Sequence, residues 1–202
     1  VLACLGVVAV LVAVYAGADH ITTLTEDKFY QARVVFTSST PYQRIVVTRG
    51  RGGHRLFLNG NLQFAERDEY RYHEALVHPA MAAHGAPKRV AVLGGGDGMA
   101  VREILKYPSV ESVTLVELDP AMTRLFAENP TLARLNGQAL HSPKLRVVNT
   151  DAFQWLQDAA GADDAFDVIV VDFPDPTNFA IGKLYTNSVY AMLDRRLAAS
   201  GY

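Results

Sequence analysis

Carboxylates follow four short apolar runs of this chain, and their spacing predicts a binding site for a cation. The acidic residues that come within a few positions after these runs are Asp97, Glu117, Asp119, Asp151, Asp172 and Asp175. Short apolar runs are typical of buried parallel strands, and open α/β sheets bind ligands at the carboxyl ends of their strands. Six carboxylates at one sheet edge produce a negative field that attracts positively charged ligands. A metal site is the alternative, ranked lower because no histidine joins the acids and four separate strands supply them.

The first of these runs leads into a glycine-rich turn, Gly94-Gly95-Gly96-Asp97-Gly98. A buried strand, such a turn and a following helix form the nucleotide-binding corner of an open α/β sheet. A helix N-terminus normally favours phosphate, and Asp97 works against an anion there. Met99 also stands where a dinucleotide fingerprint has its third glycine. The turn therefore predicts a positively charged nucleoside, although a helix-capping Asp97 explains that residue equally well.

The acids that follow the next two runs have separate expected roles. Glu117 lies 19 residues beyond Gly98 (117 − 98), the place of a carboxylate that holds ribose hydroxyls. Asp151 is expected to accept a hydrogen bond from an adenine amino group, to cap a helix, or to do both. Asp119 precedes Pro120, and this order favours a helix cap over a ligand.

The last apolar run ends in Asp172-Phe173-Pro174-Asp175-Pro176. Two prolines prevent this segment from continuing as a helix or strand, so we expect a rigid loop. A carboxylate fixed there could hold an amine and accept its proton as a general base. A proline-rich turn with solvated aspartates is the alternative.

The elements that must position these residues alternate between strands and helices. Alternation of this kind predicts a parallel sheet with right-handed crossovers. The expected strands are 90–93, 113–116, 145–148 and 168–171, and the expected helices are 99–106, 120–135, 152–160 and 187–199. The chain ends where a further strand would begin, so this sheet is expected to be incomplete at its C-terminal side.

A small antiparallel β unit is expected upstream, between about residues 28 and 65. Its predicted strands are 30–36 and 44–48, followed by 55–58 and 62–64, which flank Asn59-Gly60, a strong hairpin signal. The segment 69–84 predicts a helix with a break or kink at Pro79. The expected domains are therefore a membrane segment over 1–18, a β domain over 19–68 and a catalytic domain over 69–202.

Composition limits the classes of partner. The chain has 202 residues, a net charge of −2 and no basic stripe, which argues against nucleic acid. Cys4 is the single cysteine, which excludes an internal disulfide.

The uncharged segment 1–18 is interpreted as the end of a transmembrane helix. A secretory signal ending at Ala16-Gly17-Ala18, or a buried helix, is the alternative. Basic residues after this segment predict a cell-membrane protein whose catalytic domain faces the cytoplasm.

Several motifs together resemble the polyamine aminopropyltransferases, the spermidine synthases. They include the glycine-rich turn, Val116-Glu117-Leu118-Asp119, the loop from Asp172, Tyr42-Gln43, the hairpin 58–63 and the segment 66–74. The resemblance runs from about Tyr42 to the end of the chain, and the apolar start suggests a membrane-attached bacterial branch. It implies a class I methyltransferase-like, Rossmann-like domain preceded by a small β domain.

The resemblance also implies a reaction. Members of the family transfer the aminopropyl group of decarboxylated S-adenosylmethionine to putrescine or a related amine, giving spermidine and 5′-methylthioadenosine. The expected partners are these two cationic small molecules, the membrane through the N-terminal segment, and a second copy in a homodimer. No metal and no cofactor beyond the co-substrate are expected.

Roles for single residues follow from the resemblance by position. Asp172 would orient and deprotonate the attacking amine, and Tyr72 would help to place its nitrogen. The nucleoside would be bound by Gln43, Gly94, Gly95, Gly96, Asp97 at the amino end of the aminopropyl chain, Glu117 at the ribose, and Asp151 with Ala152 at the adenine. The amine site would be lined by Gln63, His73 and Asp175.

The chain departs from the family pattern at a few positions. Phe173-Pro174 replaces a small Ser/Thr pair between the two aspartates, and Ala152 stands where glycine is common. These changes leave the amine acceptor open. Two other functions fit the same residues: an S-adenosylmethionine-dependent methyltransferase, and a non-catalytic polyamine sensor coupled to a membrane domain.

Overall fold

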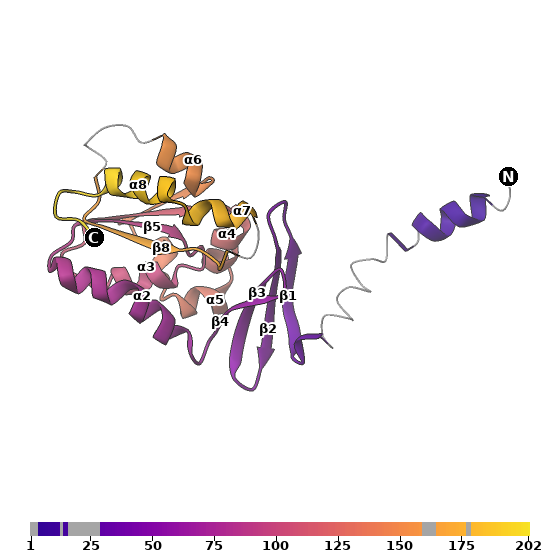
Figure 1. Cartoon of the computed structure of the whole chain (residues 1–202). Helices are drawn as coiled ribbons and strands as arrows, with labels where there is room; N and C mark the ends of the chain where they lie inside the picture. Colours follow the sequence, from indigo (N-terminus) through magenta and orange to yellow (C-terminus); the bar gives the residue numbers. More distant parts are fainter. Residues whose placement is uncertain (1–3, 13, 16–28, 159–164, 177–178) are drawn as a thin grey trace. The chain divides into compact units, whose positions relative to one another are not determined.

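The computed structural model describes residues 4–12, 14–15, 29–158, 165–176 and 179–202 (Figure 1). The chain divides into two compact units, Val1–Arg67 and Asp68–Tyr202. Each unit has its own sheet, and each is described separately below.

The N-terminal unit contains a four-stranded antiparallel sheet in the order β1-β2-β3-β4. Its strands are β1 Arg33–Ser39, β2 Arg44–Gly50, β3 Gly53–Leu58 and β4 Asn61–Ala65. Asn59 and Gly60 both have positive φ angles, 50° and 81°, as a tight hairpin turn requires. The predicted hairpin is therefore confirmed, whereas the first strand begins at Arg33 and not at residue 30 as expected.

The predicted membrane segment 1–18 lies partly outside the described residues. Residues 4–12 are helical and exposed. Within the part of the chain that the structure describes, no helix is both long and apolar enough to cross a membrane, so the transmembrane prediction finds no support there.

The second unit contains a parallel sheet in the order β7-β6-β5-β8. The strands are β5 Arg89–Gly94, β6 Ser112–Glu117, β7 Leu145–Asn149 and β8 Val168–Asp172. The helices are α2 Glu69–His84, α3 Met99–Ile104, α4 Pro120–Glu128, α5 Pro130–Leu135, α6 Ala152–Gln157, α7 Phe179–Gly182 and α8 Asn187–Arg196, with 3-10 turns η1 Ala139–His141 and η3 Lys183–Tyr185. The predicted methyltransferase-like α/β fold is confirmed.

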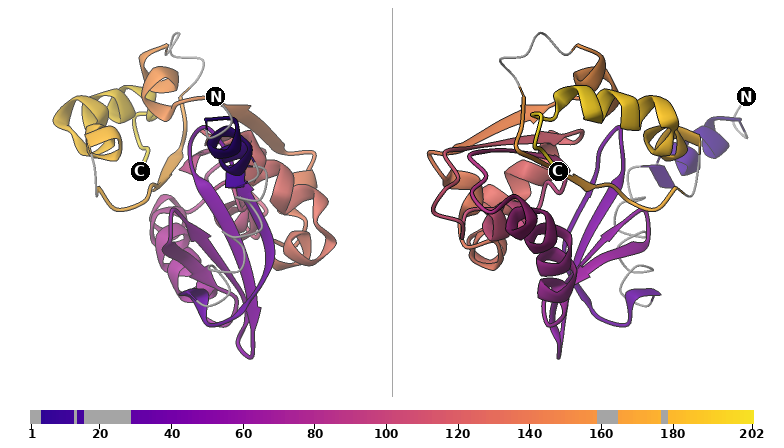
Figure 2. Two further views of the ribbon diagram at one scale, coloured as in Figure 1. Left: turned by 90° about the vertical axis from the view of Figure 1, so that its right-hand side faces the viewer. Right: turned by 60° about the vertical axis from the view of Figure 1, so that its left-hand side comes forward.

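Alternate side chains of each strand enter two separate cores, because successive residues of a strand point to opposite faces. On one face, Val90 and Val92 of β5 pack with Val77 of α2 and Ile104 of α3. On the other face, the core contains Leu93 and Val116 with side chains of α6 and α8. Helices α6 and α8 lie side by side in both views of Figure 2. The sheet is therefore covered on both faces, as parallel sheets usually are.

Several predicted helices differ from the structure, and the helix expected over 99–106 ends at Ile104. A break or a kink was expected at Pro79, and helix α2 continues through this residue without a break. Its buried side chains anchor the helix in the core, and tertiary packing outweighs local propensity. The segment 120–135 forms two helices because Asn129 accepts hydrogen bonds from the amides of Thr131 and Leu132 and starts a new helix at Pro130.

The last predicted helix, 187–199, ends earlier than expected. Helix α8 stops at Arg196, and Leu197 forms an isolated parallel bridge with Phe166. This bridge requires extended backbone, so the residues up to 199 cannot continue the helix.

Truncation of a central core side chain tests this packing. Leu115 on β6 is fully buried, and Leu115→Ala should lower the free energy of unfolding by about 2–5 kcal/mol because it leaves a cavity. Chemical denaturation measures this change. The matched substitution Leu62→Ala, at a leucine that is 55% exposed, should cost far less; equal losses for the two variants would contradict the assigned core.

Candidate functional site

The candidate site lies where β5 and β8 end, because the order of the strands reverses at this point of the sheet. The chain places β6 and β7 on one side of β5 and then returns to add β8 on the other side. Gly94 at the end of β5 pairs in register with Asp172 at the end of β8. Ligands of open α/β sheets bind in the crevice at such a switch point.

Two glycines allow Asp172 to approach the turn closely. Gly94 has a φ angle of 84°, and a Cβ atom at this position would overlap the carbonyl oxygen of Asp172. A Cβ atom on Gly95 would lie 2.7 Å from the Asp172 carboxylate. A side chain at Gly94 would displace the end of β8, and a side chain at Gly95 would displace the Asp172 carboxylate.

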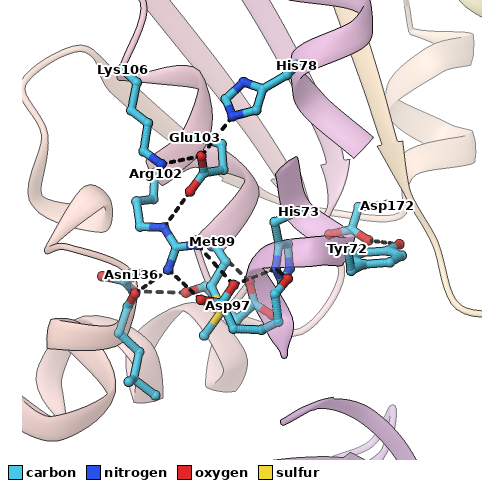
Figure 3. Close-up of polar contacts among 12 residues, drawn as sticks. Tyr72, His73, His78, Asp97, Met99, Arg102, Glu103, Lys106, Asn136 and Asp172 are labelled. Carbon is cyan, nitrogen blue, oxygen red and sulfur yellow. Dashed lines mark hydrogen bonds and ion pairs between the residues drawn. The ribbon is translucent and has the colours of Figure 1, made fainter. Parts of the chain in front are cut away.

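The Asp172 carboxylate is half-buried and accepts a hydrogen bond from Tyr72 of α2, with 2.6 Å between the hydroxyl oxygen and Oδ1 (Figure 3). Burial, together with the charge of Asp97, raises the pKa of Asp172 to about 6, and the bond from Tyr72 only partly opposes this. Burial and the Asp172 charge raise the pKa of Tyr72, so this phenol remains a donor. The structure thus brings together the two residues expected to be catalytic.

Asp97 caps the helix behind the glycine-rich turn. Its Oδ1 accepts the amide of Met99 at 2.9 Å, which satisfies one free N–H of α3. Its carbonyl oxygen accepts a hydrogen bond of 2.8 Å from the side-chain amide of Asn136, which is fully buried. The capping interpretation is confirmed, and contact of Asp97 with a ligand stays a prediction.

Glu117 is buried at the tip of β6 and connects two turns. Its carboxylate accepts the amides of Gly96 at 3.0 Å and of Asp119 at 2.9 Å. Burial raises the pKa of Glu117 to about 7, and the charges of Asp97 and Asp119 add to this rise against the effect of the two amides. The carboxylate stands beside the glycine-rich turn, where a ribose was predicted.

Asp151 uses both carboxylate oxygens within the protein. Oδ1 accepts the amide of Phe153 and caps α6, while Oδ2 pairs with Nζ of Lys183 at 2.6 Å. The predicted cap is confirmed, and binding of adenine stays a prediction. Asp119 likewise caps α4 by accepting the amide of Ala121 at 3.0 Å, as expected.

The remaining predicted residues lie on other elements or in the N-terminal unit. Gln43 precedes β2 and Gln63 lies in β4, both in the N-terminal unit. Ala152 is the first residue of α6 and is buried, and Asp175 is exposed beyond β8. Their roles toward a ligand stay predictions.

His73 is buried on α2, and sequence reasoning missed the residues that hold it. Glu69 accepts a hydrogen bond from the His73 ring and a pair of hydrogen bonds from Arg102 of α3. The spacing of Glu69 and His73, four residues apart on one helix face, was a usable signal. Arg102 lies 33 residues from Glu69, and no local sequence pattern predicts that contact.

A second group of metal-binding residue types lies near this network. Glu74, His78 and Glu103 place ligand atoms within 4.8 Å of one another. Glu103 is already paired with Arg102 and Lys106. These two cations balance the buried charge of Glu103, so the group is explained as part of an ion-pair network.

The family comparison covers most of the second unit. A family profile described as the spermine/spermidine synthase domain matches residues 69–202. The chain is 53% identical over 191 residues to a polyamine aminopropyltransferase of Leptospira interrogans, covering 95% of this chain and 38% of that protein. It is 54% identical over 193 residues to polyamine aminopropyltransferase 2 of Ralstonia nicotianae, covering 96% of this chain and 37% of that protein. The chain thus spans well under half the length of these relatives.

Solved structures show the same similarity. A spermidine synthase in complex with the transition-state analogue AdoDATO superposes with a TM-score of 0.75 and 31% identity, covering 82% of this chain and 55% of that chain. A spermidine synthase from Thermotoga maritima superposes with a TM-score of 0.70 and 28% identity, covering 82% of this chain and 53% of that chain.

The raised pKa of Asp172 makes stability depend on pH. Its folded pKa of about 6 lies above the ordinary 3.8, so its contribution to stability is fully present below about pH 4 and is lost as the pH rises through 6. Asp172→Asn removes this loss. The variant should therefore gain at most about 3 kcal/mol relative to the parent between pH 4 and pH 8.

Urea denaturation of both proteins at pH 4 and pH 8 measures this difference. Glu117 titrates in both proteins, so its contribution cancels in the comparison. A stability difference that stays the same at the two pH values would contradict the raised pKa of Asp172 in the folded protein.

Proposed function

This chain belongs to the spermine/spermidine synthase family, and we propose that it forms the transfer site of a polyamine aminopropyltransferase. The proposed reaction moves the aminopropyl group of decarboxylated S-adenosylmethionine to putrescine, giving spermidine and 5′-methylthioadenosine. The observation that carries the proposal is the half-buried Asp172 carboxylate, hydrogen-bonded to Tyr72 at the switch point of the sheet.

Asp172 has the properties of a general base for an amine. An ammonium ion has no lone pair, so the acceptor must lose a proton before its nitrogen attacks the carbon next to the sulfonium. The new N–C bond forms as the C–S bond breaks, and the sulfur leaves as a neutral thioether. With a pKa of about 6, Asp172 is largely ionised at neutral pH and can take up this proton. Tyr72, which already contacts the carboxylate, would help to position the nitrogen.

The proposed nucleoside site extends from this carboxylate along the ends of β5 and β6. Glu117, beside Gly96, would hold the ribose hydroxyls, and Asp151 the adenine amino group. Asp97 would face the amino end of the aminopropyl chain. Gln43 and Ala152 would add nucleoside contacts, and Gln63, His73 and Asp175 would line the amine site.

The acidic character of the site suits both proposed substrates, which are cations. Holding two substrates in line for displacement supplies a large part of the rate in such reactions. The membrane location, the cytoplasmic orientation and the homodimer stay predictions from the sequence.

The full-length protein, incubated with decarboxylated S-adenosylmethionine and putrescine, should release 5′-methylthioadenosine. Asp172→Asn should lower the rate by about 10²–10⁴-fold because the general base is lost, while nucleoside affinity stays within a few-fold. The parent rate should fall as the pH drops below about 6, where Asp172 takes up a proton. Chromatography of 5′-methylthioadenosine measures the rates and their pH dependence, and calorimetry measures the affinity for the nucleoside.

Asp158→Asn, at an exposed aspartate that ends α6, is the matched control and should keep full activity. Absence of methylthioadenosine with every diamine and polyamine tested would refute the proposal. Methyl transfer from ordinary S-adenosylmethionine would instead identify a methyltransferase, and amine binding without turnover would identify a sensor.

Asp97 should also select against the carboxylated form of the nucleoside. Ordinary S-adenosylmethionine carries a carboxylate near the proposed position of Asp97, and two close carboxylates repel each other. Asp97→Asn keeps an oxygen to cap α3 and removes the charge, so it should narrow the preference for the decarboxylated form by about tenfold or more. Calorimetric titration with both nucleosides measures the ratio, and an unchanged ratio would exclude this role.

A further inference from the structure

The Glu69 carboxylate joins α2 to α3 through two hydrogen bonds from Arg102, and it also contacts His73 on its own helix. Arg102 donates from its two terminal nitrogens, one to each oxygen of Glu69, at 2.9 Å each. The second oxygen, Oε2, also lies 2.8 Å from Nδ1 of His73. The two parallel hydrogen bonds from Arg102 form a bidentate pair, the geometry that gives arginine–carboxylate pairs their directional strength. Figure 3 shows Arg102 and His73 within this network.

Arg102 is itself fixed from two other directions. It donates a hydrogen bond of 2.6 Å to the carbonyl oxygen of Leu135 and another of 2.8 Å to the buried Glu103. The hydrogen bonds from His73 and Arg102 outweigh burial and lower the pKa of Glu69 to about 2. Glu69 is therefore a charged acceptor with a fixed orientation at every working pH.

These contacts determine which nitrogen of His73 carries a proton. Nδ1 lies 2.8 Å from Glu69 Oε2 and 2.8 Å from the Glu69 carbonyl oxygen. An ionised carboxylate and a carbonyl oxygen only accept hydrogen bonds, so Nδ1 must be the donor. None of the residues that the structure describes forms a hydrogen bond with Nε2, so Nε2 is the nitrogen that can exchange a proton.

The groups around His73 favour a positive charge on its ring. Burial, with 2% of the residue exposed, works against the charge. The hydrogen bond to Glu69 and the carboxylates of Asp97 and Asp172 outweigh it and raise the pKa of His73. The Tyr72 ring lies edge-on to the imidazole, with 5.1 Å between centroids. Three carboxylates from three elements thus act on one imidazole.

We propose that Glu69, fixed by Arg102, is a positioning residue that holds His73 as the Nδ1–H tautomer and leaves Nε2 to the substrate amine. With the site empty, a protonated Nε2 offsets the repulsion between Asp97 and Asp172. When a cationic substrate supplies that charge, Nε2 releases its proton to solvent and accepts a hydrogen bond from an N–H of the substrate amine. This role rests on the proposed function, because it gives the amine as the ligand of Nε2.

The first test measures His73 itself and needs no turnover. NMR titration of the imidazole, with His73→Gln to assign its signal, should show a pKa lower by about 1–3 units in Glu69→Gln than in the parent. The carbon and nitrogen shifts of the neutral ring should also lose their pure Nδ1–H signature. Glu111→Gln, which breaks an exposed ion pair with Lys88, is the matched control and should leave the His73 titration unchanged.

A second variant covers the case in which Glu69→Gln does not fold. Arg102→Lys keeps a positive charge but loses the two parallel hydrogen bonds to Glu69. Like Glu69→Gln, this variant should therefore populate both neutral tautomers of the His73 ring. A His73 titration and tautomer identical to the parent in each folded variant would overturn the proposal.

The second test separates positioning from a general effect on the fold. In the full-length protein, Glu69→Gln should lower kcat/KM for the amine by about tenfold or more, since it weakens a charge-assisted hydrogen bond. In a His73→Gln background the same change should have little further effect, because Glu69 acts through His73. Additive losses would refute the positioning role. Absence of product from the parent would refute the proposed function and leave the NMR result to decide the role of Glu69.

Discussion

The close pairing of β5 and β8 is the constraint on which the site depends. The register of these strands places Asp172 directly beside Gly94, and the backbone there leaves no space for a Cβ atom. The helices on both faces pack against the same strands. This packing fixes the position of the end of β8. The carboxylate at the centre of the proposed chemistry is therefore positioned by backbone geometry, and Tyr72 adds only its final orientation.

The site concentrates negative charge at a cost that the surrounding structure offsets residue by residue. Asp97 is bound by a helix amide, Glu117 by two backbone amides, and Asp172 by a phenol. These partners compensate for burial only in part, since the pKa values of Glu117 and Asp172 remain above their ordinary range. Groups with strongly shifted pKa values cluster at binding and catalytic sites, where function requires buried charges that do not favour stability.

Local sequence patterns predicted the elements well and the contacts between them poorly. The strands, the glycine-rich turn and the Asn59-Gly60 hairpin follow from side-chain periodicity and turn chemistry, which act over a few residues. Asn129-Pro130 was also a readable signal for the break between α4 and α5. The ion pair of Asp151 with Lys183 and the bond of Tyr72 to Asp172 join residues 32 and 100 positions apart, and only the family resemblance had placed Tyr72 and Asp172 at one site. Such pairs depend on the tertiary arrangement, which no local pattern encodes.

The double contact of Glu117 has a consequence for how the site opens. One carboxylate binds the amide of Gly96 in the first turn and the amide of Asp119 in the second. Neither turn can separate from the sheet without breaking a hydrogen bond to a group that is 9% exposed. Glu117 thus holds both amides, and loss of its carboxylate would leave both open to exchange with solvent. A ligand that engages Glu117 slows the exchange of both amides at once, which couples the ends of β5 and β6 through a single side chain.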